Sequence, residues 1–279
     1  MDYKMIAVDL DGTLYSDEKE ILPETAAALK KAAAQGAYII PSTGRPLMGI
    51  PENVLGLGCI EYAVTCNGAA VYNVKSGELL FEEPMECEKA SEIITVLKRF
   101  DISVDAFING KAYKERSQIS IIDSLALSEY MKNYLRNTRI YVDDLAQFVY
   151  GEGITVHKIT LNFSVDGRGG FTDRAKTAEY LNTVEGITVV SGGMNNLEIT
   201  KKGVNKGKAL LKTGELLGVS QSEIIAFGDS GNDIDMINAA GTGVAMANST
   251  PEILAAADLV TRSNNDNGIA YALSELMDI

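Results

Sequence analysis

Residues 5–13, Met-Ile-Ala-Val-Asp-Leu-Asp-Gly-Thr, place two carboxylates directly after a continuous apolar run. The run at 5–8 has the composition of a strand that is buried on both faces, as in the middle of a parallel sheet. Asp9 and Asp11 follow it, and residues two apart in an extended strand point to the same side. Two such carboxylates raise each other's pKa unless a cation lies between them. A divalent cation with oxygen ligands is the usual partner, although a strand that ends in a polar turn is the simpler alternative.

The composition is that of a globular protein with a large core, since 46% of the 279 residues are hydrophobic and 23% are charged. This length suits one large domain or a core with a sizeable insertion. No apolar run approaches the roughly 20 residues that span a bilayer, and the first residues show no signal-peptide pattern. The formal net charge of −13 disfavours nucleic acids and anionic membranes as partners. An anionic ligand would therefore need local positive charge at its site.

Three cysteines, Cys59, Cys66 and Cys87, are odd in number and lack metal-ligand spacing. We expect them to be reduced thiols of a cytoplasmic protein. The sequence makes no prediction about the oligomeric state.

The chain continues with a predicted helix over 21–35 and predicted buried strands over 37–41 and 61–65. These strands end in two polar loops, Ser-Thr-Gly-Arg at 42–45 and Cys-Asn-Gly at 66–68. Strands and helices that alternate in this way are typical of a parallel α/β sheet. In such sheets ligands bind outside the carboxyl ends of the strands, where these loops would lie.

Near residue 85 the pattern changes to antiparallel strands with helices between them. Asn109-Gly110, between apolar segments at 104–108 and 112–115, predicts a hairpin. Further elements are predicted as strands at 157–163, 188–191 and 197–200 and as helices at 86–100, 123–137 and 173–184. We therefore predict an inserted α+β domain at 85–194, within a core made of 1–84 and 195–279.

From Asn205 the first pattern returns. Asn205 can cap a helix over 206–217, and a strand over 223–227 opens into a second acidic stretch, Gly-Asp-Ser-Gly-Asn-Asp-Ile-Asp at 228–235. Carboxylates are favourable at a helix N-terminus, which could explain one or two of them. That explanation does not account for two acidic strand ends in one chain.

Asp229 would lie at the tip of its strand, and together with Asp9 and Asp11 it would form an oxygen site for Mg²⁺. Lys206 stands in the first turn of a predicted helix, where a cation costs a few tenths of a kcal/mol. It either neutralises a bound anion or is an ordinary surface lysine. Ser42-Thr43-Gly44 offers hydroxyls and backbone N–H groups to a phosphate, although by itself such a stretch is more often a simple turn.

These stretches, in this order, resemble the haloacid dehalogenase superfamily, specifically its Cof-type phosphatases of subfamily IIB with a C2-type cap. The resemblance covers nearly the whole chain. It rests on the motifs Asp9-Leu-Asp-Gly-Thr13, Ser42-Thr-Gly-Arg45, Asn67-Gly68, Gly203-Val-Asn-Lys-Gly207, Gly228-Asp-Ser-Gly-Asn-Asp233, Gly243-Val-Ala-Met-Ala-Asn248 and Asn267-Gly268.

The resemblance implies a Rossmann-like parallel-sheet core with an inserted α+β cap. It implies that Asp9 is the nucleophile and that Asp11 is the general acid and base. Mg²⁺ would be held by the Asp9 carboxylate, the Asp11 backbone carbonyl and Asp229, with support from Asp233. The groups expected to bind the phosphoryl oxygens are Thr43, Lys206, the backbone N–H groups of Leu10 and Gly44, and Asn232. Arg45 and Asn67 would face the substrate, and Asn248 would line the same cleft.

The predicted function is a Mg²⁺-dependent phosphatase that hydrolyses a small phosphorylated metabolite, such as a sugar phosphate. One alternative is a sugar phosphomutase, which would need a bisphosphate activator. The other is a non-catalytic protein that binds a phosphorylated metabolite, and the presence of Asp9, Asp11, Lys206 and Asp229 argues against it. The sequence does not identify the substrate.

Overall fold

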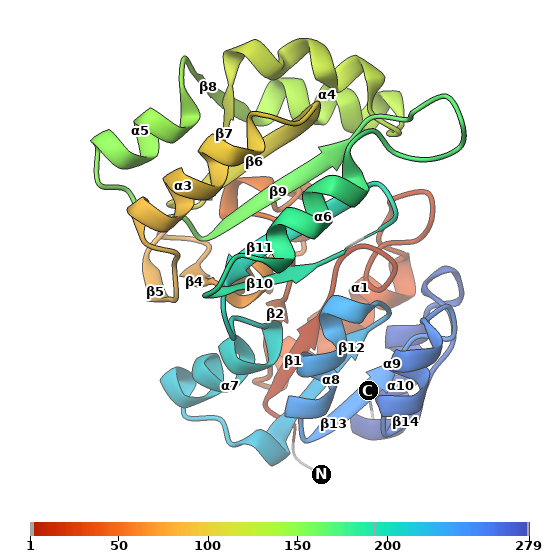
Figure 1. The fold of residues 1–279 in the computed structure, drawn as a ribbon. Helices are drawn as coiled ribbons and strands as arrows, with labels where there is room; N and C mark the ends of the chain where they lie inside the picture. Colours follow the sequence, from red (N-terminus) through yellow and green to blue (C-terminus); the bar gives the residue numbers. More distant parts are fainter. Residues whose placement is uncertain (1–2, 192, 278) are drawn as a thin grey trace. The chain divides into compact units, whose positions relative to one another are not determined.

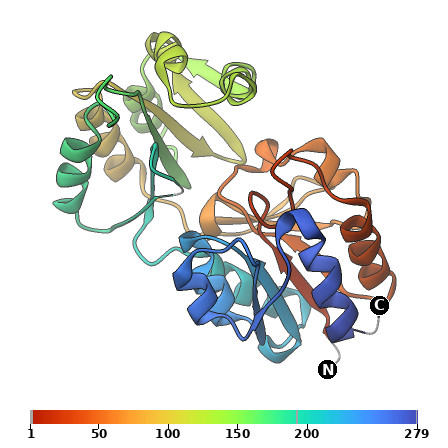
Figure 2. The same cartoon turned by 90° about the vertical axis from the view of Figure 1, so that its right-hand side faces the viewer.

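The computed structural model describes residues 3–191, 193–277 and 279, and the chain forms two compact units (Figures 1 and 2). The core unit comprises Met1–Glu82 and Val204–Ile279, and the inserted unit comprises Glu83–Gly203. The second boundary lies at 203/204 and not at the predicted 194/195. The reason is that the strand Asn196–Lys201 pairs on both sides with strands of the inserted unit.

The core unit contains a five-stranded parallel sheet in the order β14-β13-β12-β1-β2. Its strands are β1 (Met5–Val8), β2 (Tyr38–Pro41), β12 (Ile224–Gly228), β13 (Thr242–Ala245) and β14 (Leu259–Val260). The apolar run at 5–8 forms the predicted strand, and all four of its residues are buried. Because Val8 pairs with both Phe227 and Pro41, the loops that follow β1, β2 and β12 meet at one edge of the sheet.

Helices cover both faces of this sheet. Ile6 and Val8 pack in one hydrophobic cluster with α1 (Pro23–Ala34) and α10 (Gly268–Met277). Met5 and Ala7 pack in another with α7 (Lys206–Leu217) and α8 (Ile234–Ala239). The remaining core helices are the short α2 (Glu52–Leu55) and α9 (Pro251–Ala256). By strand alternation Asp9 continues the row of Met5 and Ala7, on the face that α7 covers.

Helix α7 has both predicted ends. Its N-cap Asn205 accepts a hydrogen bond from the Lys208 backbone N–H at 2.8 Å, and Gly218 ends it in the left-handed region at φ +69°.

The strand predicted at 61–65 is present as β3 (Tyr62–Thr65), but it continues into an unpredicted antiparallel sheet with β4 (Ala70–Asn73) and β5 (Leu79–Glu82). Only isolated parallel bridges, Ile39 to Ile60 and Ser42 to Val64, join β3 to β2. The loop at 66–68 still lies beside the loop that follows β2, because the Asn67 N–H donates to the Thr43 carbonyl at 3.1 Å.

The inserted unit has a six-stranded sheet in the order β10-β11-β9-β6-β7-β8, and Figure 1 shows α3 and α6 in front of it. Residues of α3, α5 and α6 pack with the apolar side chains of this sheet. The strands are β6 (Ile102–Ile108), β7 (Lys111–Glu115), β8 (Arg139–Val142), β9 (Lys158–Phe163), β10 (Ile187–Val190) and β11 (Asn196–Lys201). The helices are α3 (Cys87–Leu97), α4 (Glu129–Thr138), α5 (Leu145–Gly151) and α6 (Arg174–Asn182). Asn109 and Gly110 form the predicted hairpin turn, with φ of +47° and +74°.

The inserted sheet also buries charged side chains. The Asp105 carboxylate lies 2.9 Å from Lys114 Nζ and 3.1 Å from Arg139 Nη2. Lys158 Nζ lies 2.6 Å from the Glu198 carboxylate. Each buried cation here has a carboxylate partner within the same sheet.

Across the described part of the chain, no helix has the length and apolar character needed to cross a bilayer.

Candidate active site

Three carboxylates come together at the carboxyl edge of the core sheet. One oxygen from each of Asp9, Asp229 and Asp233 lies within 4.8 Å of the others. The parallel pairing of β1 with β12 creates this contact, and the Asp9 N–H donates to the Phe227 carbonyl at 3.1 Å. Asp9 and Asp233 are both buried. The two acidic strand ends predicted to converge therefore do so.

Lys206 is completely buried at the start of α7. Its Nζ lies 2.6 Å from Asp9 Oδ1 and 2.6 Å from Asp233 Oδ1. Burial alone would lower the pKa of this lysine, but the charges of Asp233 and Asp9 raise it above its ordinary value. The alternative of a solvated surface lysine is therefore wrong, and an ammonium group stands next to Asp9.

One ammonium does not balance three carboxylates. Burial and the charge of Asp233 raise the pKa of Asp9 well above its ordinary value, although Lys206 opposes them. Burial and Asp233 also raise the pKa of Asp229 to about 6, against the effect of a hydrogen bond from Thr13. A cluster of hard oxygen donors with excess negative charge fits a divalent cation.

Asp229 is held by the loop that follows Asp11. Thr13 Oγ1 donates to Asp229 Oδ1 at 3.0 Å. A Cβ on Gly12, which has φ +88°, would lie 2.5 Å from Asp229 Oδ2, so only glycine fits this position. The sequence reasoning did not include Thr13 among the site residues. Its place directly after the Asp-x-Asp-Gly stretch was the available signal.

Asp233 orders the acidic loop after β12. Its Oδ2 accepts hydrogen bonds from the backbone N–H groups of Asp229 and Ser230, each at 3.1 Å, and its Oδ1 accepts from Lys206. Both oxygens are thus occupied by the protein, which leaves Asp9 and Asp229 as the more available carboxylates. Asn232 is half-buried in the same turn, where its Oδ1 accepts from Ser230 Oγ at 2.9 Å.

Thr43 and Gly44 follow β2 at the same edge of the sheet. Thr43 is buried, and its Oγ1 accepts from the Arg45 N–H at 3.2 Å. Asn67 is also buried and adopts φ +59°. A Cβ on Gly68 would overlap the Asn205 carbonyl oxygen, so the loop at 66–68 packs against the start of α7. This packing brings Gly68 close to the backbone of Asn205 and Lys206.

Asp11 does not belong to the acidic cluster formed by the described residues. Its carboxylate lies 3.0 Å from Arg45 Nη2 and 3.0 Å from Lys19 Nζ. Burial would raise the pKa of Asp11, but Arg45 and Lys19 outweigh it and hold that pKa below its ordinary value. Lys19 had not been predicted to take part in the site.

Two other residues that the sequence predicts for the site lie in or against the loop that follows β1. Asn248 Nδ2 donates to the Gly12 carbonyl at 2.8 Å, and its Oδ1 accepts from the Asn264 N–H at 3.0 Å. Asn248 thus fixes the position of Gly12. The Leu10 side chain lies in the hydrophobic core, so its backbone is the part that can serve the site.

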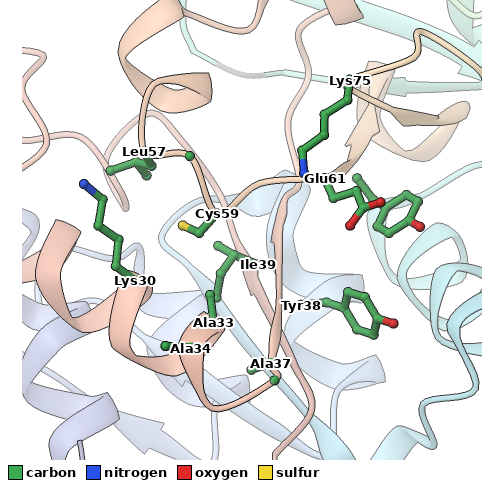
Figure 3. A pocket seen from close by; sticks show the side chains of 13 residues that line it. Lys30, Ala33, Ala34, Ala37, Tyr38, Ile39, Leu57, Cys59, Glu61 and Lys75 are labelled. Atoms are coloured by element: carbon green, nitrogen blue, oxygen red, sulfur yellow. The ribbon is translucent and has the colours of Figure 1, made fainter.

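A separate pocket of about 650 Å³ lies at the opposite end of the sheet, beside the first residues of β2 and β3 (Figure 3). Its lining combines Lys30, Lys75 and Glu61 with apolar residues around Cys59. Because it opens at the amino ends of the strands, it is distinct from the acidic cluster.

Comparisons with known proteins show the family to which this chain belongs. The model of the haloacid dehalogenase-like hydrolase family matches residues 6–273. Pyridoxal phosphate phosphatase YbhA of Escherichia coli is 30% identical over 273 residues, which cover 97% of each chain. 5-Amino-6-(5-phospho-D-ribitylamino)uracil phosphatase YcsE of Bacillus subtilis is 29% identical, and the match covers 98% of this chain and 95% of that protein.

Among solved structures, a haloacid dehalogenase-like hydrolase from B. subtilis superimposes with a TM-score of 0.81 at 26% identity, over 98% of this chain and 100% of the other. This chain belongs to the haloacid dehalogenase-like hydrolases. The family, the α/β fold class and the enzyme class that the sequence predicted, a phosphoric monoester hydrolase, are confirmed.

Proposed function

We propose that this chain is a Mg²⁺-dependent phosphatase that hydrolyses a small phosphorylated metabolite, such as a sugar phosphate, through an aspartyl-phosphate on Asp9. The observation that carries the proposal is the buried Lys206 ammonium, 2.6 Å from Asp9 at the edge of an acidic cluster. The named relatives support the substrate class, because both act on small organic molecules that carry one phosphate ester.

In this proposal Asp9, Asp229 and the backbone carbonyl of Asp11 hold Mg²⁺, and Asp233 supports them. The ion would neutralise the excess negative charge of the cluster and polarise a phosphoryl oxygen when bound. The donors fit this role because the cluster offers carboxylate oxygens, which Mg²⁺ prefers. Burial and repulsion from Asp233 raise the pKa values of Asp9 and Asp229, and a bound cation would oppose both effects.

The first step is attack of an Asp9 carboxylate oxygen on phosphorus. The bond between phosphorus and the leaving oxygen breaks, and Asp11 gives a proton to that oxygen. In the second step Asp11 takes a proton from water, and the resulting hydroxide attacks phosphorus. The bond to Asp9 then breaks, which releases inorganic phosphate and restores the carboxylate.

Positive charge and hydrogen-bond donors would stabilise the phosphoryl oxygens during both steps. We assign this role to Lys206, Thr43, Asn232 and the N–H groups of Leu10 and Gly44. Arg45 and Asn67 stand on neighbouring loops and would contact the substrate. Asn248 would contribute by holding the Gly12 loop, through its bond to the Gly12 carbonyl.

The test is phosphate release from phosphorylated sugars, nucleotides and vitamins by the purified protein, with Mg²⁺ or with EDTA. We expect release that requires Mg²⁺ and is lost in Asp9→Asn and Lys206→Met. Asp235→Asn removes an exposed carboxylate from α8 and is the matched control. Undiminished release by Asp9→Asn would overturn the assignment of the nucleophile, and undiminished release in EDTA would overturn the metal requirement.

We also propose that the protein acts in the cytoplasm. Cys59, Cys66 and Cys87 form no disulfide with any described residue, which suits a reducing compartment.

A further inference from the structure

We propose that Lys19 and Arg45 form a binding site for a second anionic group of the substrate, such as a carboxylate on the leaving group. This inference rests on the proposed phosphatase function and adds a substrate class to it: phosphate esters that carry another negative charge. Both cations belong to the core unit, beside the loops that follow β1 and β2.

Two cations from different loops converge on the Asp11 carboxylate. Lys19 Nζ lies 3.0 Å from Oδ1. Arg45 Nη2 lies 3.2 Å from Oδ1 and 3.0 Å from Oδ2, while its Nε lies 3.3 Å from Oδ2. A guanidinium that engages both oxygens of a carboxylate has the geometry with which arginine recognises carboxylate and phosphate ligands. Asp11 therefore fills this site as an internal anion.

The proposed reaction requires Asp11 to move from this position. Both of its oxygens accept hydrogen bonds from Lys19 or Arg45, but one of them must carry a proton to the oxygen of the leaving group. If Asp11 moved alone, Lys19 and Arg45 would lose their shared carboxylate. The carboxylate or second phosphate of a substrate can replace Asp11 between the two cations. The ion pairs with Asp11 are then exchanged for ion pairs with the substrate. A neutral leaving group offers no such exchange.

Arg45 is held in place by contacts that do not involve Asp11. Its N–H donates to Thr43 Oγ1 at 3.2 Å, and its carbonyl accepts from the Cys66 N–H at 3.0 Å. Its Nη1 donates to the Gly49 carbonyl at 3.4 Å. Only 19% of its side chain is exposed. The guanidinium can therefore remain in position when Asp11 moves away.

Lys19 is fixed by a tight turn in the loop after β1. Its N–H donates to the Ser16 carbonyl at 3.0 Å, and its φ of +62° lies in the left-handed region. Asp17 in the same turn accepts hydrogen bonds from Asn264 and Asn265, which tie the turn to the C-terminal segment. Half of the Lys19 side chain is exposed to solvent, so a substrate can reach its ammonium group.

The charge of the chain makes this pair of cations unusual. The protein carries a formal net charge of −13, and an anionic ligand needs local positive charge against that background. Lys206 supplies such charge to the phosphoryl group in the proposed function. Lys19 and Arg45 supply it separately, around Asp11, which is the arrangement expected for a substrate with two anionic groups.

The experiment compares D-3-phosphoglycerate with sn-glycerol 3-phosphate. These compounds share a phosphate ester on a three-carbon skeleton and differ by one carboxylate. Each compound is measured both as a substrate and as a competitive inhibitor of p-nitrophenyl phosphate hydrolysis. The preference can therefore be determined even for a compound that the protein binds but does not hydrolyse. We expect the wild-type protein to prefer the carboxylate compound by about tenfold, and Lys19→Met to reduce that preference about fivefold, as for one partly exposed ion pair.

Two further variants sharpen the result. Lys19→Arg should keep most of the preference, and Lys19→Glu should abolish it. The control is Lys31→Met, which removes an exposed lysine from the last turn of α1 and should keep the wild-type preference.

Equal affinity of the wild-type protein for both compounds would overturn the inference, as would a preference that survives Lys19→Glu. Failure of the proposed function has a different signature, namely no hydrolysis of any ester, p-nitrophenyl phosphate included. The preference would then be read from dissociation constants measured by calorimetry, and the same two outcomes would decide it.

Discussion

In the core unit one buried lysine faces three carboxylates, whereas in the inserted unit two buried cations share one carboxylate. Lys206 is paired with Asp9 and Asp233, and Asp229 lies beside them. Asp105 is paired with Lys114 and Arg139, and both of its oxygens face a cation. The first cluster has an excess of negative charge, and the second has a smaller excess of positive charge.

The two buried aspartates respond in opposite directions. Burial acts to raise the pKa of each, but Asp233 adds repulsion at Asp9, so the pKa of Asp9 is raised. At Asp105 the charges of Arg139 and Lys114 outweigh burial, and its pKa is lowered. Burial of a charged group is therefore not enough to mark a functional site. Repulsion between carboxylates that the neighbouring cations do not offset is the better mark.

The largest expected effect is a loss of activity without a loss of stability when Asp9 of the core cluster is substituted. Asp9→Asn should lower kcat on the order of 10³-fold or more, because it removes the proposed nucleophile. In EDTA its thermal unfolding midpoint should be no lower than that of the wild type, since an ionised Asp9 is unfavourable in the folded state. Phosphate release and thermal unfolding of the same preparation test both parts. A variant that is inactive because it fails to fold would contradict this prediction.

The matching change in the inserted unit should act on stability. Asp105→Asn leaves Lys114 and Arg139 buried without a counter-charge, which costs about 3–5 kcal/mol of unfolding free energy. Urea unfolding measures the loss. The control is Asp123→Asn, which removes an exposed carboxylate paired with Arg136 and should change stability by less than about 0.5 kcal/mol. Equal effects of the two substitutions would show that the buried network does not stabilise the unit.

The two regions should also differ in their dependence on pH. In metal-free protein the folded-state pKa of Asp229, about 6, lies above its ordinary value of 3.8. The folded state then holds a proton that the unfolded state has lost, so stability falls as pH rises from about 4 to about 6, by up to about 3 kcal/mol. Asp105 has the opposite sign, because its lowered pKa contributes stability above pH about 4 that is lost in acid.

Urea unfolding in EDTA, from about pH 4 to about pH 7, distinguishes these contributions. The difference between wild type and Asp229→Asn should grow in favour of the variant as pH rises. A difference that stays constant across this range would argue against a raised pKa for Asp229.

The smallest expected effect is stabilisation by the metal. Mg²⁺ at 100 times its dissociation constant should stabilise the wild-type protein by about 2.7 kcal/mol, if it binds only the folded state. Thermal unfolding with Mg²⁺ or EDTA measures this shift. Asp229→Asn should weaken it and Asp235→Asn should preserve it. A shift of the same size in both variants would exclude Asp229 as a ligand.

Local chemistry made part of this molecule predictable. The apolar run at 5–8, the Asn205 cap, the Gly218 stop and the Asn109-Gly110 turn each depend on a few consecutive residues, and each is present in the structure. The convergence of Asp9 and Asp229 followed from the rule that parallel strands bring their carboxyl ends to one edge.

Contacts between distant residues made the rest unpredictable. Lys206 meets Asp9 across 197 residues, and its burial cannot be read from its neighbours in the chain. Lys19 contacts Asp11 from a turn in which its backbone adopts a left-handed conformation that non-glycine residues seldom take. The predicted boundary at 194/195 left the strand at 196–201 outside the inserted unit, although the sequence pattern groups a strand at 197–200 with the elements of that unit. Its residues suit an edge of either unit, and only its pairing with β9 and β10 decides the matter.

The division of the core sheet between the two ends of the chain has a consequence for protein synthesis. Strand β1 needs β12 as a neighbour, but the ribosome makes β12 only after the whole inserted unit. The inserted unit is one continuous segment, so all its strands can pair while β1 still lacks β12. The acidic cluster can form only once Lys206 and Asp229 have emerged. An interrupted translation product that ends before β12 would therefore contain Asp9 and Asp11 but no assembled site.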